Sequence, residues 1–284
     1  MKYGIIGGSG LYEMEGLTDI QELTVSTPFG DPSDQYISGK LEGQEIVFLP
    51  RHGRGHRYLP SEINYRANIW GMKSLGVTHL ISVSAVGSLR KEIEPGNIVL
   101  PDQFIDRTKD RPSTFFGNGV VAHLQFGQPV CAHLSAAISE IVEKIGVVCH
   151  KGGTYICMEG PIFSTKAESE MYRSFGASVI GMTNLQEAKL AREAELCFST
   201  IALSTDYDCW HESEEEVSVD AILAVMRKNV ENTKAILKEL VQTYQPPSPE
   251  CSDQSSLAGA ILSDKSLIPA ETRERLDIII GKYL

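Results

Sequence analysis

Two acidic residues, Asp206 and Asp208, lie on either side of a tyrosine in the segment STDYDCW. The apolar run LCFSTIAL over residues 196–203 precedes them and predicts a buried strand. Ligands of an α/β sheet bind at the carboxyl ends of its strands, so this pair is a candidate functional site. The alternative is that both acids cap the helix expected from residue 217.

Three more segments carry groups suited to binding an anion. GGSG (7–10) contains Ser9 between glycines, whose backbone amides can approach a phosphate; an ordinary tight turn is the alternative. PRHGRGHRYLP (50–60) is a basic loop with Arg51 and His52, and a solvated loop or an RNA contact is the alternative. SVSAVGSL (82–89) offers the Ser84 hydroxyl at the end of another expected strand, or is simply a tight strand-to-loop transition.

Two segments could bind a flat ring and a sugar. MEGPIFST (158–165) combines a carboxylate, a Gly-Pro turn, Phe163 and the Ser164 hydroxyl. GMTN (181–184) ends an expected strand with Met182 and Thr183. A Met or Phe in such a segment is usually part of the core, but at the mouth of a sheet it can form an apolar wall for a ligand.

These segments require a frame of alternating strands and helices. Apolar runs predict strands at 3–7, 45–50, 78–85, 177–182 and 196–203. Helical spacing predicts helices at 61–76, with Ser61 as N-cap and Gly76 as the stop, and near 133–145, 165–175, 185–194 and 217–243. The alternation indicates an α/β protein with a largely buried, partly parallel sheet.

The segment QPPSPE (245–250) is the one clear linker. It divides the chain into a domain of residues 1–245 and a C-terminal linker and helical tail, residues 246–284. The tail retains apolar runs such as LDIIIGKYL, so we expect it to dock on the same chain or on a neighbouring subunit.

Composition narrows the functional classes. The 284 residues are 42% hydrophobic and carry a formal net charge of −11, which argues against nucleic-acid or anionic-membrane binding. No signal peptide or membrane-spanning run is visible, so we expect a cytoplasmic protein. The six cysteines have no CxxC spacing and read as reduced, mostly buried thiols. HExxH and EF-hand patterns are missing too, so no metal site is expected.

Seven segments in order along residues 3–240 resemble the trimeric nucleoside phosphorylases: IGGSGL, PFGDPSD, RHGRGHRYLPSEINYRANIW, VSAVGSLR, PGNIVLPDQFIDRT, MEGPIFSTKAES and STDYDCW. The resemblance implies a single-domain α/β fold with a twisted mixed β-sheet flanked by helices, and a homotrimer. It implies a pentosyltransferase that uses inorganic phosphate as co-substrate and no cofactor. The most similar branch converts S-methyl-5′-thioadenosine to adenine and 5-methylthioribose 1-phosphate, in purine and methionine salvage.

The resemblance also implies roles for individual residues. Asp206 would protonate or hydrogen-bond N7 of the adenine, and Asp208 would accept from its 6-amino group. The residues implied for phosphate binding are Ser9, Arg51, His52, Ser84, Ala85 and Thr183. Those implied for the nucleoside are Phe163, Ser164, Met182, Val219, Ile222 and Leu223, with His123 and Leu267 reaching the 5′ pocket of a neighbouring subunit.

Two other functions stay open at this point. A 6-oxopurine nucleoside or methylthioinosine phosphorylase is disfavoured because similar 6-oxopurine enzymes have asparagine where Asp206 stands. Gly181, where the family commonly has asparagine, and Asn184 nevertheless leave room for a broader choice of substrate. A nucleotide- or RNA-binding protein could instead use the basic loop. Only a phosphorylase would consume a nucleoside in a phosphate-dependent way.

Overall fold

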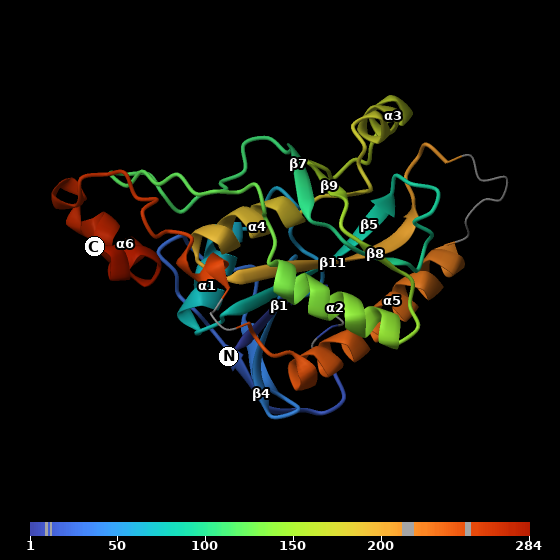
Figure 1. Ribbon diagram of the computed structural model, residues 1–284, viewed down its shortest axis with the longest axis horizontal. Helices are drawn as coiled ribbons and strands as arrows, with labels where there is room; N and C mark the ends of the chain where they lie inside the picture. Colours follow the sequence, from blue (N-terminus) through green and yellow to red (C-terminus); the bar gives the residue numbers. More distant parts are fainter. Residues whose placement is uncertain (9–10, 12, 212–218, 248–250) are drawn as a thin grey trace.

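The computed structural model describes the chain except for residues 9–10, 12, 212–218 and 248–250 (Figure 1). Among the described residues, eleven strands form one mixed sheet with the path β2-β3-β4-β1-β5-β10-β9-β7, and β11 pairs with β5 beside that path. The expected single-domain α/β fold with a mixed sheet is confirmed. The strands are β1 (Tyr3–Gly7), β2 (Leu17–Leu23), β3 (Tyr36–Leu41), β4 (Gln44–Pro50), β5 (His79–Ser88), β6 (Ile98–Leu100), β7 (Gln103–Arg107), β8 (Cys149–Lys151), β9 (Thr154–Met158), β10 (Val179–Gly181) and β11 (Cys197–Tyr207).

Helices cover both faces of this sheet. On one face α2 and α5 lie side by side, and their apolar residues join one core with β1, β4 and β11 (Figure 1). On the other face α1 and α4 pack together in a second core. The helices are α1 (Tyr65–Ser74), α2 (Ala132–Lys144), α3 (Lys166–Ser174), α4 (Asn184–Glu193), α5 (Val219–Thr243) and α6 (Ala270–Ile280).

The first helix begins later than its sequence pattern suggests. Ser61 was expected to be the N-cap, and this expectation is wrong: the helix starts at Tyr65, and Asn64 is the N-cap. The Asn64 side chain accepts a hydrogen bond from the backbone N–H of Ala67, so it supplies the acceptor that Ser61 was expected to supply. The expected stop is confirmed, because Gly76 follows the helix with a φ of +79°.

The C-terminal tail packs on its own chain at the end of the molecule away from α3 (Figure 1). Leu276, Ile279 and Ile280 of α6 are buried in the same core as α1 and α4. The tail also pairs with an extended segment of the domain, because His123 N–H donates to the Ala260 carbonyl and Leu262 N–H donates to the Val121 carbonyl. The division of the chain at residue 245 stays a prediction.

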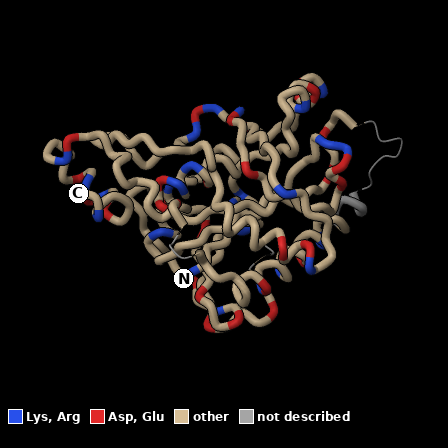
Figure 2. The backbone as a smooth tube through the Cα atoms, in the orientation of Figure 1, with Lys and Arg blue, Asp and Glu red and all other residues tan. Residues whose placement is uncertain are grey.

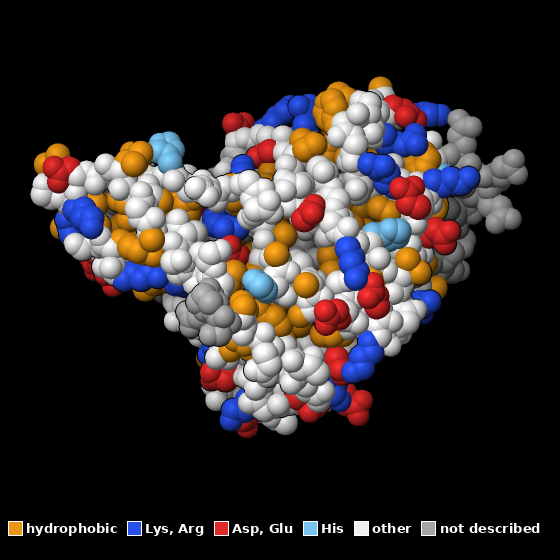
Figure 3. All heavy atoms as spheres, in the orientation of Figure 1, with side chains coloured by type: hydrophobic (Ala, Val, Ile, Leu, Met, Phe, Trp, Pro, Cys, Tyr) orange, Lys and Arg blue, Asp and Glu red, His pale blue; other side chains and the backbone are white. Residues whose placement is uncertain are grey.

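None of the helices in the described part of the chain is long and apolar enough to cross a membrane. Charged residues of both signs are distributed along the described part of the backbone (Figure 2). Acidic and basic groups are interspersed over the face drawn in Figure 3.

Candidate active site

The carboxyl ends of four strands meet at one edge of the sheet. β1 is parallel to both β4 and β5, and β11 is parallel to β5, so all four strands point the same way. The loops that follow them therefore emerge together. A direct link is the Arg51 N–H, which donates to the Gly7 carbonyl over 3.0 Å and joins the basic loop after β4 to the end of β1.

Asp206 and Asp208 lie at this edge, beside β5. A register shift between Ser204 and Asp206 brings Asp206 opposite Gly87 of β5. A Cβ added at Gly87 would lie 3.6 Å from the Asp208 Cβ and 3.7 Å from an Asp206 carboxylate oxygen. Both acids thus lie at van der Waals distance from the position a side chain at Gly87 would take.

The two acids differ in their surroundings. The Asp206 side chain reaches solvent, but the protein around it raises the pKa of its carboxyl above the ordinary value. A 2.6 Å hydrogen bond from the Thr205 hydroxyl opposes this shift, and the negative charge of Asp208 adds to it. Asp208 is buried, and its Oδ2 has no hydrogen-bond partner among the described residues. Asp206 therefore keeps its proton to a higher pH than an ordinary aspartic acid, and Asp208 has a free acceptor.

The loop after β9 lies next to this pair. The Cys209 thiol donates to the Ser164 carbonyl over 3.3 Å, which brings Ser164 close to the end of β11. Phe163 is 77% exposed, so it is not a core residue and is free to cover a ligand. Thr165 ends the loop as the N-cap of α3, in a capping box with Glu168.

Arg51 is at the predicted phosphate site, but its guanidinium is turned into the protein. It is 3% exposed, and its Nε and Nη2 donate to the two carboxylate oxygens of Glu187 over 2.5 and 2.9 Å. The same guanidinium donates to the Val83 carbonyl and to the Ser82 hydroxyl. Most of its donors are thus occupied, and its predicted contact with phosphate stays a prediction.

His52 is held in one tautomer by the backbone. Its Nδ1 lies 2.9 Å from the Tyr58 carbonyl, which can only accept, so Nδ1 carries the proton. Its ring stacks on that of His56, with the centroids 4.2 Å apart. Burial lowers the pKa of His52 to about 4, and the positive charge of Arg51 contributes to this. A neutral His52 with Nδ1–H has a free acceptor at Nε2, which suits a protonated phosphate oxygen.

The remaining residues predicted to bind phosphate and sugar lie on two neighbouring segments. Ser84 and Ala85 belong to β5, and Met182 and Thr183 follow β10, which is antiparallel to β5. Ile180 of β10 lies opposite Gly87 of β5, so the chain after β10 runs back along β5 toward Ser84 and Ala85. Thr183 is buried at the start of α4, and its hydroxyl makes no capping hydrogen bond. Met182 packs against Gly160, where an added Cβ would lie 2.5 Å from the Met182 sulfur.

Tyr155 fills the space next to Gly181. Its hydroxyl lies 3.2 Å from the Ser84 hydroxyl, and a Cβ on Gly181 would lie 1.9 Å from it. Glycine at this position, where the family commonly has asparagine, is therefore required by the tyrosine.

Three buried residues of this region were missed from the sequence. Glu187 pairs with Arg51, Tyr155 contacts Ser84, and Arg111 donates to the backbone carbonyls of Met182 and Glu159. Arg111 thereby joins the loop after β9 to the loop after β10. None of the three had a local signal, and Glu187 lies in the mixed helix sequence NLQEAKLARE, which also contains Glu193, Lys189 and Arg192.

Ser9 and the side chains of Val219, Ile222 and Leu223 lie outside the described part of the structure. His123 and Leu267 lie in the region of the tail, and both are exposed, Leu267 by 77%. They are thus available to another subunit.

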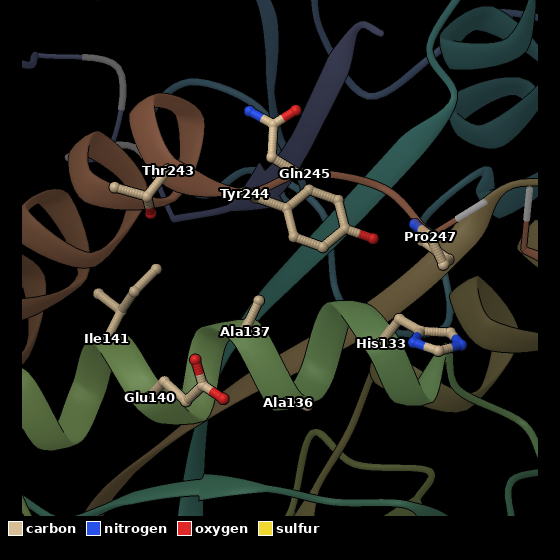
Figure 4. A pocket seen from close by; sticks show the side chains of 9 residues that line it. All are labelled: His133, Ala136, Ala137, Glu140, Ile141, Thr243, Tyr244, Gln245 and Pro247. Carbon is tan, nitrogen blue, oxygen red and sulfur yellow. The ribbon is translucent and has the colours of Figure 1, made fainter.

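A pocket of about 440 Å³ lies elsewhere, between α2 and the end of α5 (Figure 4). His133 and Glu140 of α2 and Tyr244 after α5 are among its lining residues. None of the predicted site residues contributes to it, so it is separate from the candidate active site.

Comparison with known proteins shows the family of this chain. The model of the phosphorylase superfamily matches residues 2–242. An S-methyl-5′-thioadenosine phosphorylase of Geobacter sulfurreducens is 64% identical, and the match covers 99% of this chain and 98% of that protein. Another of the same name, from Koribacter versatilis, is 59% identical, with 99% and 96% covered.

Solved structures agree as well. A methylthioadenosine phosphorylase from an antarctic soil metagenomic library superimposes with a TM-score of 0.93 at 44% identity, covering 98% of each chain. The methylthioadenosine phosphorylase of Schistosoma mansoni in complex with adenine has a TM-score of 0.84 at 34% identity, covering 92% of this chain and 99% of that one.

Proposed function

This chain belongs to the phosphorylase superfamily, and on that premise we propose that it cleaves S-methyl-5′-thioadenosine with inorganic phosphate. The products are adenine and 5-methylthioribose 1-phosphate, so the enzyme is a pentosyltransferase. The observation that carries the proposal is the pair Asp206 and Asp208 packed against Gly87, at the edge where the candidate phosphate loops emerge. The high identity to relatives of this name over nearly the whole chain supports the same reaction.

The reaction needs a proton donor next to the purine. The bond between C1′ and N9 breaks while a phosphate oxygen bonds to C1′, and negative charge develops on the purine. Asp206, whose pKa is raised, donates its proton toward N7 and relieves that charge. The proton that phosphate loses on forming its ester balances the proton that adenine gains. The free Oδ2 of Asp208 accepts from the 6-amino group.

Phosphate binds on the face of the ribose opposite the purine, next to C1′. The proposed groups are the neutral Nε2 of His52, the hydroxyls of Ser9, Ser84 and Thr183, and the backbone at Ala85. Arg51 adds positive charge beneath them, partly balanced by Glu187. Met182 lies beneath the ribose, and its backbone is fixed by Arg111. No cofactor beyond phosphate is required by this chemistry.

A substrate panel tests the proposal. Purified protein is incubated with methylthioadenosine, adenosine, methylthioinosine or inosine, with and without phosphate, and release of free base is followed. We expect phosphate-dependent release of adenine from methylthioadenosine at the highest kcat/KM. Base release without phosphate would indicate a hydrolase, and a preference for inosine or methylthioinosine would favour the 6-oxopurine alternative.

We further propose that the enzyme is a cytoplasmic homotrimer that acts in purine and methionine salvage. The exposed His123 and Leu267 support the trimer, since a neighbour's 5′ pocket would give them a function. In this arrangement Phe163 and Ser164 cover the base, and Val219, Ile222 and Leu223 form the apolar wall for the methylthio group.

A further inference from the structure

Three cysteines from distant parts of the chain converge away from the active site. Cys131 is the N-cap of α2, Cys197 is the first residue of β11, and Cys251 lies in the tail, just before a short 3-10 helix. The carboxylate of Asp253, two residues after Cys251, joins them. The three sulfur atoms and one Asp253 oxygen all lie within 4.8 Å of one another.

We propose that Cys131, Cys197, Cys251 and Asp253 bind a zinc ion that fastens the tail to the domain. This site is independent of the phosphorolysis proposed above. Sequence spacing could not reveal it, because no two of the cysteines are close in sequence.

The geometry fits a tetrahedral ion. Zinc–thiolate bonds of about 2.3 Å place two sulfurs of a tetrahedron about 3.8 Å apart. The Cys131 and Cys251 sulfurs are 3.3 Å apart, so binding requires only a small displacement. That separation is well beyond the roughly 2.05 Å of a disulfide bond, and all three are free thiols.

The surroundings are those of a structural zinc site. Cys131, Cys197 and Asp253 are buried, and Cys251 is half-buried. Three thiolates and a carboxylate carry four negative charges, of which a divalent ion neutralises two. Arg192 supplies another positive charge, because its Nη1 lies 2.7 Å from an oxygen of Asp253. Such an outer partner orients a ligating carboxylate.

The four ligands would join three elements. Cys131 lies at the start of α2 and Cys197 at the start of β11, both within the first core, whereas Cys251 and Asp253 belong to the tail. A pocket of about 410 Å³ reaches Cys251 from the surface and offers an entry path. Metal binding would thus couple the placement of the tail to the stability of the domain.

Zinc content and a cobalt spectrum test the site directly. The full chain without an affinity tag is purified in the absence of chelators, and its metal content is determined by elemental analysis. We expect about one zinc per chain, and an increase in melting temperature when zinc is added to metal-free protein. Cobalt(II) added to metal-free protein should give thiolate-to-cobalt charge-transfer bands and the visible bands of a tetrahedral ion.

Variants locate the ligands. Cys251→Ser and Asp253→Asn should each weaken zinc binding by at least about 100-fold in competition with a chromophoric chelator, exceeding the effect of losing an outer partner. Cys149→Ser, at a half-buried thiol outside the cluster, is the matched control and should bind zinc like the wild type. If Cys251→Ser does not fold, the zinc affinity of Asp253→Asn and the cobalt spectrum of the wild type still test whether the cluster binds a metal.

Two outcomes would overturn the proposal. One is wild-type protein that neither retains zinc nor gives a tetrahedral cobalt spectrum. The other is purified, metal-free protein with two fewer titratable thiols than the six cysteines of the chain, which would mean that the cluster forms a disulfide instead.

Discussion

Arg51 and Glu187 form a two-point ion pair in the interior, with Nε–Oε1 and Nη2–Oε2 distances of 2.5 and 2.9 Å. The pair joins the loop after β4 to helix α4, directly beneath the proposed phosphate site. Both side chains are almost fully buried. The conformation of that loop therefore depends on a charge in a different part of the chain.

Removing one member of this pair should destabilise the fold. Glu187→Ala leaves the buried guanidinium without its counter-charge, and we expect the free energy of unfolding to fall by about 3–5 kcal/mol. The double variant Arg51→Met with Glu187→Met should recover part of this loss, because no unpaired charge is then buried. Urea unfolding measures both. A Glu187→Ala protein as stable as the wild type would contradict the expectation.

Arg51→Ala should also weaken phosphate binding. Among the described residues the Arg51 Nη1 donates to the Val83 carbonyl, which leaves its second N–H for phosphate. A charge-assisted hydrogen bond contributes roughly 1.5–3 kcal/mol, which corresponds to a loss of about 10- to 100-fold in affinity. The control is Arg54→Ala in the same loop, whose ion pair with Glu22 is largely exposed. Initial rates at varied phosphate measure the effect. A folded Arg51→Ala enzyme with unchanged phosphate dependence would remove Arg51 from the site.

Asp206→Asn should change the choice of base. Asparagine carries an amide donor that can serve O6 or N7 but cannot transfer a proton, so activity on methylthioadenosine should fall. The preference over methylthioinosine should narrow or reverse, since the new amide can donate to O6 and so offset part of the roughly 1–3 kcal/mol that an unsatisfied O6 facing Asp208 costs. The measurement is the ratio of the two kcat/KM values at matched phosphate. If the ratio does not change, the two acids serve only to cap the following helix.

Gly181→Ala should be costly even though alanine is small. The added Cβ would lie 1.9 Å from the Tyr155 hydroxyl, and overpacking of this kind costs typically about 1–3 kcal/mol. Tyr155 also contacts Ser84, so kcat/KM should fall as well. Gly127→Ala is the matched control, because an added Cβ there has no neighbour within 4 Å. Equal melting temperatures for the two variants would refute this account.

The free energy of unfolding should decrease between pH 6.5 and 4 through His52. Burial lowers its pKa from 6.5 to about 4 in the folded protein, so the unfolded chain binds an extra proton within this window. The free energy of unfolding therefore falls as the pH falls. Above about pH 6.5, His52 no longer contributes to its pH dependence. His52→Gln should show a shallower decrease in urea unfolding across the same range. An identical pH dependence in wild type and variant would mean that folding does not lower the pKa of His52.

The proposed trimer predicts a dependence of activity on assembly. Sedimentation equilibrium should give about three times the 31.2 kDa mass of the chain. Leu267→Ala should raise the KM for methylthioadenosine more than that for adenosine, because the apolar contact with the methylthio group is lost. A fully active monomer would exclude a shared site.

The sequence by itself determined the architecture and predicted where the candidate site lies. The run at residues 3–7 coincides with β1, and the run at 196–203 covers most of the buried part of β11, which continues to Tyr207, because parallel strands between helices are largely apolar. Polar residues directly after such runs mark the ligand-binding edge, and this is how Asp206 and Asp208 were found. Shorter strands such as β6 and β8, of three residues each, have no pattern long enough to recognise.

Only the tertiary structure decided which side chains meet. Glu187 reaches Arg51 across 136 residues of sequence, Tyr155 occupies the space beside Gly181, and Cys131 meets Cys251 across 120 residues. Each of these contacts joins elements that become neighbours through strand pairing or helix packing. The local hydrophobic pattern indicates whether a residue is buried and on which face it lies. The identity of its partner depends on how the elements pack together in the whole chain.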